Sequence, residues 1–251
     1  MIADRIAVDT ISALDHDAWM DLAKAEFDRV LALVDDLADA DFSRPTDCTG
    51  WDVTAVLGHM LGMLELQADP EDRVRQITTA AQTVEQTGGL RLDALTALQV
   101  HEHAHLSTSE LKDALHDAVP RGLAARRAMP LQMRETPYDP EIPGERPWTF
   151  GYLFDIIHTR DPWLHRIDIC RAAGRNPELT ADHDARIVAD VVRDWAPRHG
   201  QGFTLTLTGP AGGAFTAGDG TVVLERDAVE FCRILSGRGE GTGLLSTRVV
   251  F

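Results

Sequence analysis

Apolar residues in the first 175 positions recur mostly at intervals of three or four, which is the spacing of amphipathic helices. The pattern predicts helices over Ala18–Leu37, Asp52–Asp69, 71–87, a segment from near Leu90, a segment from the capping-box residue Ser107, and Phe150–Ala172. Proline lacks the backbone N–H that a helix interior needs. We therefore expect an interruption at Pro120 and a kink or restart at Pro162.

Residues 130–147 carry a high density of proline, with five of the twelve in the chain. Such a segment is expected to form neither a helix nor a central strand, because each proline removes a hydrogen-bond donor. A loop of this length inside a compact unit is uncommon and often functional. We expect it to act as a lid or as a wall of a pocket.

The pattern changes after Pro177. Alternation of apolar and polar residues predicts a strand over Phe203–Thr208. The other elements expected here are helices over Thr180–Trp195 and Asp227–Leu235 and strands at Ala214–Thr216, Thr221–Leu224 and Arg248–Phe251. The predicted fold class is α+β, with an antiparallel helical bundle over residues 1–175 and a small α+β domain over residues 176–251.

Composition narrows the class of protein. The 251 residues carry a formal charge of −16, from 24 Lys and Arg against 40 Asp and Glu, which disfavours nucleic-acid and anionic-lipid partners. No apolar run approaches the roughly 20 residues of a membrane span. The first ten residues lack a signal-peptide pattern, and three cysteines cannot form a disulfide framework. We expect a soluble, acidic protein of the cytoplasm, whose reducing environment fits the few cysteines.

One histidine lies within a strongly apolar helix. His59 borders the buried stripe of the segment VLGHMLGML, between Gly58 and Gly62. Glycine destabilises a helix by about 1 kcal/mol relative to alanine, so the pair suggests close packing or room beside a side chain. His59 is therefore either a metal ligand or a core histidine that a hydrogen bond satisfies at a helix contact.

A second segment, TRDPWLHRIDIC, supplies the groups that would complete a metal site. Asp161 and His165 are four residues apart and share one helical face. Together with His59 they would form a two-histidine, one-carboxylate set, which leaves positions for water or substrate. The alternatives are an ordinary surface pair, or Asp161 as an N-cap before Pro162. His158 is a candidate fourth ligand or a group that orients a ligand.

Other reactive residues give weaker signals. His101 and His105 in HEHAH lie four apart but lack a third ligand, and we interpret them as a solvated helical face. Cys48 precedes a helix N-terminus and could be acidified there, although packing is the expected role of all three cysteines.

The segments PTDCTGWDVTAVLGHMLGMLE and TRDPWLHRIDIC together resemble the mycothiol-dependent maleylpyruvate isomerase family, of the DinB-like four-helix-bundle superfamily. The tail, with FTLTLTGP and DAVEFCRILSGRG, is similar to the small sterol-carrier-like α/β domain of many family members. The resemblance implies a divalent metal, zinc first and otherwise nickel, iron or manganese, held by His59, Asp161 and His165. The family's acid is glutamate, so the shorter Asp161 departs from the pattern. Asp168 would either orient the imidazole of His165 or be an ordinary surface acid.

The resemblance also implies a reaction class. A metal-bound thiol such as mycothiol becomes a thiolate, which attacks a small electrophile in isomerisation or S-transfer. Arg238, and less clearly Arg166 and Arg160, are candidate cations for an anionic substrate, or else salt-bridged structural arginines. The alternative functions are a metal-dependent hydrolase that uses activated water, and a non-catalytic module that binds a ligand or partner.

Overall fold

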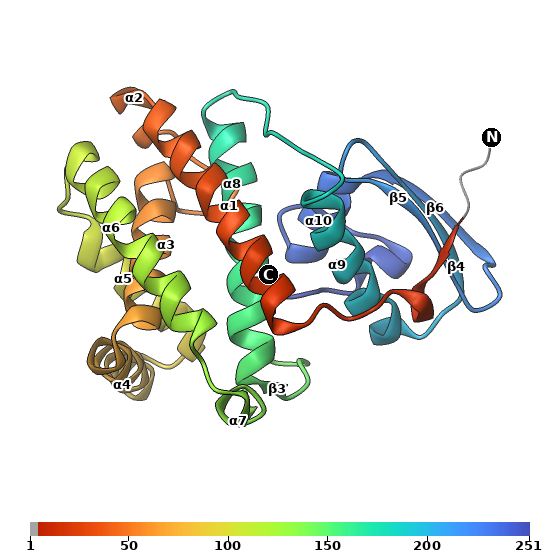
Figure 1. Cartoon of the computed structure of the whole chain (residues 1–251), viewed down its shortest axis with the longest axis horizontal. Coiled ribbons are helices and arrows are strands. Elements are labelled where there is room, and N and C mark those ends of the chain that lie inside the picture. Colours follow the sequence, from red (N-terminus) through yellow and green to blue (C-terminus); the bar gives the residue numbers. More distant parts are fainter. Residues whose placement is uncertain (1–4) are drawn as a thin grey trace. The chain divides into compact units, whose positions relative to one another are not determined.

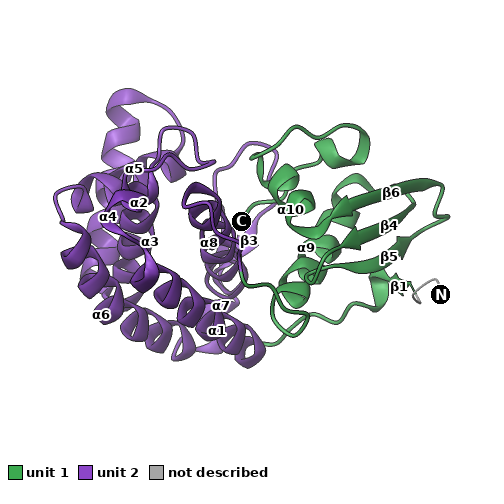
Figure 2. Cartoon of the chain, turned by 90° about the horizontal axis from the view of Figure 1, so that it is seen from above, with its two compact units in different colours: residues 1–15, 178–251 green, residues 16–177 purple. Residues whose placement is uncertain are grey.

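The chain folds into a helical unit and a smaller α/β unit (Figure 1). The structure, a computed structural model, describes residues 5–251; residues 1–4, which begin the segment without a signal-peptide pattern, lie outside them. One compact unit is His16–Pro177, and the other combines residues up to Asp15 with Glu178–Phe251 (Figure 2). The predicted α+β class is confirmed. The division after Pro177 lies near the expected boundary at residue 175, whereas the first residues group with the C-terminal unit.

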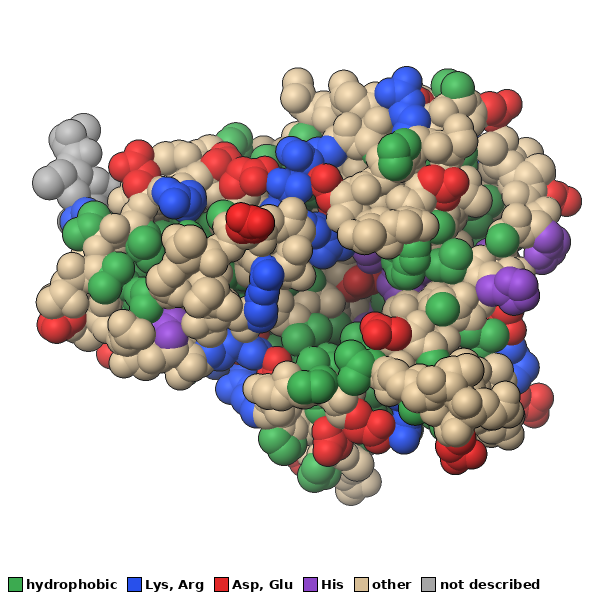
Figure 3. Space-filling view, turned by 180° about the vertical axis from the view of Figure 1, so that it is seen from behind, with side chains coloured by type: hydrophobic (Ala, Val, Ile, Leu, Met, Phe, Trp, Pro, Cys, Tyr) green, Lys and Arg blue, Asp and Glu red, His purple; other side chains and the backbone are tan. Residues whose placement is uncertain are grey.

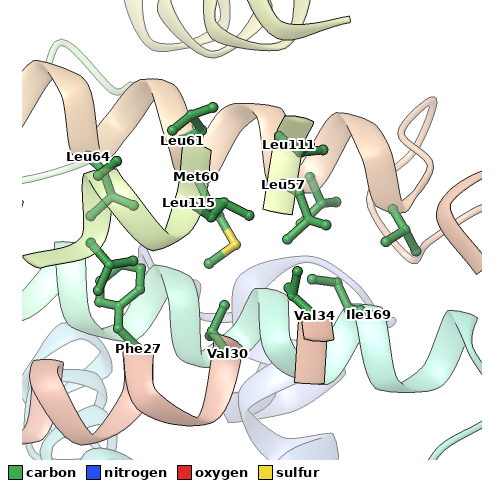
Figure 4. Packing of buried hydrophobic residues seen from close by; sticks show 14 of the residues in the cluster. Phe27, Val30, Val34, Leu57, Met60, Leu61, Leu64, Leu111, Leu115 and Ile169 are labelled. Carbon is green, nitrogen blue, oxygen red and sulfur yellow. The ribbon is translucent and has the colours of Figure 1, made fainter. Parts of the chain in front are cut away.

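The helical unit is built on four helices, α1 (His16–Asp36), α3 (Val53–Ala68), α6 (Thr108–Arg127) and α8 (His158–Ala172). Helix α3 packs against α6 and α8, and α1 packs against α6 and α8. Their apolar faces meet in one core, which Figure 4 shows from close by. Residues of that core include Phe27, Val30, Val34, Leu57, Met60, Leu61, Leu64, Leu111, Leu115 and Ile169.

Shorter elements complete this unit. They are α2 (Asp39–Phe42), α4 (Pro70–Thr87), α5 (Arg91–His103), α7 (Leu131–Arg134), strands β2 (Pro137–Tyr138) and β3 (Trp148–Thr149), and a π-helical turn η2 (Tyr152–Ile157). Helix α5 packs on both α3 and α4. The proline-rich segment is thus not wholly irregular, since it contains α7 and pairs β2 with β3 in antiparallel fashion. Its role as a lid or pocket wall stays a prediction.

The α/β unit contains a mixed sheet with strand order β1-β5-β4-β6. Its strands are β1 (Ile6–Ala7), β4 (Phe203–Thr208), β5 (Gly213–Ala217) and β6 (Val222–Asp227), and its helices are η1 (Val8–Thr10), α9 (Asp184–His199), α10 (Ala228–Ser236) and η3 (Gly243–Ser246). Strand β4 runs antiparallel to β5 and parallel to β6, and β1 runs parallel to β5. The predicted alternation holds, because Phe203, Leu205 and Leu207 are buried.

Two expectations for the α/β unit are wrong. The helix expected from Thr180 begins at Asp184 and continues to His199; the Asp184 carboxylate accepts a hydrogen bond from the Thr180 N–H instead, at 2.7 Å. The segment 248–251 is not a strand, because the Val249 N–H donates to Leu235 O at 3.2 Å and thereby bonds to the end of α10.

The interruption expected at Pro120 is wrong, and α8 does not restart at Pro162, whereas a kink at Pro162 stays a prediction. Helix α6 continues through Pro120, and α8 continues through Pro162. In α8 the N–H that proline lacks would bond to His158 O, and the buried guanidinium of Arg126 donates to that oxygen instead, at 3.0 Å. Arg126 also donates to the Thr159 hydroxyl at 2.8 Å. Burial lowers the pKa of Arg126 to about 10, which still leaves it a cation.

No helix among residues 5–251 is long and apolar enough to cross a membrane. On the face drawn in Figure 3, basic and acidic side chains are interspersed.

Replacement of Arg126 should destabilise the helical unit. Arg126→Met removes the charged donors to His158 O and Thr159 Oγ1 and leaves the carbonyl oxygen of His158 without the donor that replaces the missing proline N–H, so we expect the free energy of unfolding to fall by roughly 3 kcal/mol. Urea unfolding measures the change. Arg121→Met, on the exposed side of the same helix, is the matched control and should have little effect. Equal losses in the two variants would contradict the role of Arg126.

The contact between α3 and α5 predicts a pH effect on stability. Buried His103 places Nε2 3.0 Å from Glu65 Oε2 and Nδ1 2.7 Å from Gln99 O. Burial alone lowers the pKa of His103, but both hydrogen bonds and the charges of Glu65 and Glu102 outweigh it, so the pKa is raised. A raised folded-state pKa gives stability that is complete below the unfolded-state value of 6.5 and lost as the pH rises through the folded-state pKa.

Comparison of the wild type with Glu65→Gln tests this effect. We expect the wild type to exceed the variant in unfolding free energy more at about pH 6 than at about pH 9. Thermal unfolding across this range measures the difference. His101→Gln, at an exposed histidine of the same helix, controls for loss of an imidazole. A gap between wild type and Glu65→Gln that does not narrow with rising pH would refute the prediction.

Candidate metal centre

Helix α3 carries His59 into the interior of the helical unit. The helix begins at Val53 because the Asp52 carboxylate accepts a hydrogen bond from the Ala55 N–H at 2.8 Å. His59 is 7% exposed. A Cβ at Gly62 would lie 2.6 Å from Gln99 Cγ, and one at Gly58 would lie 3.2 Å from His103 Cβ. The two glycines therefore allow α5 to approach α3 closely, as their spacing suggested.

Helix α8 presents Asp161 and His165 on one face. His165 Nε2 lies 3.2 Å from Asp161 Oδ1, and His59 Nε2 lies 3.5 Å from Asp161 Oδ2. The rings of His59 and His165 meet edge to face, with centroids 5.3 Å apart. The structure thus brings the three predicted ligands together from two helices. Asp161 lies within the first turn of α8 and is neither an N-cap nor an isolated surface acid.

The three side chains fit a divalent cation. One ligand atom from each lies within 4.8 Å of the others. Oδ2 of Asp161 is buried and has no hydrogen-bond partner in the structure, so the cluster has an unsatisfied acceptor where a cation would supply the missing interaction. Two imidazole nitrogens and a carboxylate oxygen form a donor set that suits zinc and several other transition metals.

The pKa values of Asp161 and His165 depend strongly on each other. Burial alone raises the pKa of Asp161, but the charge of His165, the hydrogen bond between these two residues and the nearby imidazole of His59 hold it well below its usual range. Burial alone lowers the pKa of His165, but the Asp161 carboxylate and hydrogen bonds to Asp161, Asp168 and Cys48 hold it well above its usual range. Without a cation, the two residues therefore form a buried ion pair.

Each imidazole is also held at its outer nitrogen. His165 Nδ1 lies 3.2 Å from Oδ2 of Asp168, which is fully buried and so is not an ordinary surface acid. His59 Nδ1 lies 2.7 Å from Gln99 Oε1. A hydrogen bond at Nδ1 orients the ring and leaves Nε2 for the cluster. The alternative expectation for His59, a core histidine satisfied by a hydrogen bond, is met at Nδ1 by Gln99. Its Nε2 faces Asp161 and remains available to a cation.

Sequence reasoning missed three neighbours of the site. Cys48 Sγ donates to Asp168 Oδ2 at 3.4 Å, and the Trp51 ring lies 5.3 Å from that of His59. Both come from the turn-rich segment before α3, whose composition indicates only a loop. Gln99 was missed because a glutamine in an amphipathic helix normally faces solvent. Gly62, which makes room for Gln99, was the available signal.

The remaining predicted residues lie elsewhere. His158 is outside the three-ligand cluster; its Nδ1 lies 2.9 Å from Gln67 Nε2, and burial, with the charge of Arg126, lowers its pKa to about 3. Both His101 and His105 are exposed.

The candidate cations for an anionic substrate differ in burial. Arg166 forms a buried ion pair with Glu26, with Nε 2.6 Å from Oε1, and Arg160 is fully buried. Arg238 follows α10 in the α/β unit, where its N–H donates to Arg233 O at 2.9 Å. The catalytic role of Arg238 stays a prediction.

Comparison with known proteins agrees with this architecture. The model of the family described as mycothiol maleylpyruvate isomerase N-terminal domain matches residues 23–170, more than half of the chain. Crystal structures of the mycothiol-dependent maleylpyruvate isomerase, and of a histidine-to-alanine mutant of it, are each 16% identical with a TM-score of 0.59, and the matches cover 93% of this chain and 92% of theirs. No curated protein matches the sequence. At that identity the structures show a shared fold, while the family match extends across the bundle: the chain belongs to the mycothiol maleylpyruvate isomerase N-terminal domain family.

Proposed function

We propose that the protein is a divalent-metal-dependent enzyme that activates mycothiol, or a similar low-molecular-weight thiol, to attack a small electrophile. The reaction is isomerisation or S-transfer. The observation that carries the proposal is the cluster of His59, Asp161 and His165, with its unsatisfied carboxylate oxygen, in a chain of this family. A divalent cation in such a site supplies a Lewis acid that lowers the pKa of a thiol ligand.

The side chains of the cluster have distinct tasks in this proposal. His59 and His165 would hold a divalent cation through Nε2, because their Nδ1 atoms are engaged by Gln99 and Asp168. Asp161 contributes one negative charge and lies between the two imidazoles. With three protein ligands, positions remain for a thiol. The half-buried ring of Trp51 lies beside both imidazoles and would shield that side from water.

Metal content tests the site. Protein purified without added metal should contain about one equivalent of a divalent ion, and His59→Ala should retain less than about a tenth. His101→Ala, at an exposed histidine, is the control and should keep the wild-type content. Elemental analysis measures both. A wild-type content below about a tenth of an equivalent, unchanged in His59→Ala, would instead favour a non-catalytic binding module.

Chelation provides a second readout of the same site. A cation that links α3 and α8 stabilises the folded state by about 4 kcal/mol when its free concentration is a thousand times its dissociation constant. A strong chelator should therefore lower the melting temperature of the wild type but not that of His59→Ala. An identical melting temperature with and without chelator would exclude a tightly held ion.

Dependence on a thiol distinguishes the reaction class. Consumption of a small electrophile such as maleylpyruvate should require mycothiol, and His165→Ala should abolish it because one ligand is lost. Chromatography of substrate and product measures turnover and separates isomerisation from S-transfer. Equal turnover without any thiol would identify metal-activated water as the nucleophile and would replace this proposal by the hydrolase.

A further inference from the structure

A continuous line of hydrogen bonds extends from His59 Nδ1 through the side chains of Gln99, Gln76 and Asp72. Gln99 Oε1 lies 2.7 Å from His59 Nδ1, and Gln99 Nε2 lies 2.9 Å from Gln76 Oε1. Gln76 Nε2 in turn lies 2.7 Å from Asp72 Oδ2. Gln76 and Gln99 are 0% and 2% exposed, so neither amide can exchange its protein partners for water. The line therefore runs from α4 through α5 to α3.

The direction of every bond in this line is fixed at Gln76. Its amide nitrogen faces two groups that can only accept, Gly62 O at 3.0 Å and the Asp72 carboxylate. A flipped amide would place an oxygen against both acceptors. The NH₂ group of Gln76 must therefore point to them, and its carbonyl oxygen must face Gln99.

The orientation of the Gln76 amide also determines which nitrogen of His59 carries a hydrogen. Because Gln76 Oε1 accepts, Gln99 presents its NH₂ group there and its carbonyl oxygen to the imidazole. That oxygen can only accept, so His59 Nδ1 carries the hydrogen. The lone pair of a neutral His59 then lies on Nε2 and faces Oδ2 of Asp161, the carboxylate oxygen that has no hydrogen-bond partner, so that two acceptors meet where a divalent cation would bind both.

At the end of the line away from His59, ion pairs fix the side chain of Asp72. Asp72 accepts from Arg75 Nε at 2.8 Å, and Arg75 Nη2 donates to Glu102 Oε2 at 2.9 Å. This ion-pair network keeps Asp72 as a carboxylate that accepts only. At the inner end, Gly62 lets Gln99 approach, since any Cβ there would lie 2.6 Å from Gln99 Cγ.

We propose that Gln76 and Gln99 are positioning residues that hold His59 as the Nδ1–H tautomer, with Nε2 ready to bind a divalent cation. The tautomer is a property of the metal-free chain. Only its consequence for binding rests on the proposed function. Groups that orient a ligating histidine typically change metal affinity about 10- to 100-fold when they are replaced.

The tautomer can be measured directly. Long-range proton–nitrogen NMR spectra of metal-free protein with ¹⁵N-labelled histidine, at mildly alkaline pH, should show His59 protonated at Nδ1, with the signal assigned by its loss in His59→Gln. Gln99→Met keeps the side-chain length without the amide, and it should shift His59 toward the Nε2–H form. Gln76→Met leaves the Gln99 amide free to flip and should give a mixture of the two tautomers.

Zinc affinity is the second measurement, by competition with a chromogenic chelator. Gln99→Met should bind Zn²⁺ about 10- to 100-fold more weakly than the wild type, and Gln76→Met should lie between them. Gln67→Met is the matched control. Gln67 is equally buried in α3 but contacts His158, so its replacement should change neither the His59 tautomer nor the affinity.

The outcomes separate this proposal from the proposed function. If His59 of the wild type is found in the Nε2–H form, the proposed role of Gln76 and Gln99 is wrong, even if Gln99→Met fails to fold. A folded Gln99→Met variant that kept both the Nδ1–H tautomer and the wild-type zinc affinity would also overturn it. If the wild type binds no Zn²⁺ while His59 remains Nδ1–H, the proposed metal-dependent function is wrong, but the role of Gln76 and Gln99 in fixing the tautomer is supported.

Discussion

The Asp161 carboxylate is the group on which the candidate metal centre depends, because it is largely removed from water and needs compensating charge or donors. Each imidazole turns an Nε2 toward it, from α3 on one side and from the next turn of α8 on the other. Loss of the His165 imidazole would leave that carboxylate poorly compensated. The approach of His59 to Asp161 places residues of two helices far apart in the sequence side by side and so gathers the proposed ligands.

Helix α8 places Asp161 and His165 on one face because the helix continues through Pro162. The carbonyl oxygen of His158 has lost its usual partner at Pro162, and Arg126 of α6 supplies a charged donor in place of the N–H. The π-helical turn η2 ends at Ile157, and Arg126 also donates to the hydroxyl of Thr159 in the first turn of α8. A buried guanidinium is costly to desolvate, and its hydrogen bonds to the backbone and to a hydroxyl offset that cost.

The parts of the site that sequence could predict are those with a local signature. His59 stood out among apolar residues, and the spacing of Asp161 and His165 placed them on one face of a helix. Gln76 had no signature, because a buried glutamine in an amphipathic helix looks like a surface residue until its partners are known. The continuity of α8 through Pro162 could not be predicted for the same reason: Arg126, the residue that compensates for the missing N–H, lies on another helix.

The two imidazoles are held by partners of different charge, and this difference bears on the proposed chemistry. Asp168 places a full negative charge beside His165, whereas Gln99 gives His59 only an amide oxygen. Together with Asp161, the cluster then carries two carboxylates, which match the charge of a divalent cation. A third carboxylate at Gln99 would make the centre anionic and would repel an arriving thiolate in a site of low dielectric. Glutamines fix the tautomer without that charge, which suits the proposed binding of a thiolate.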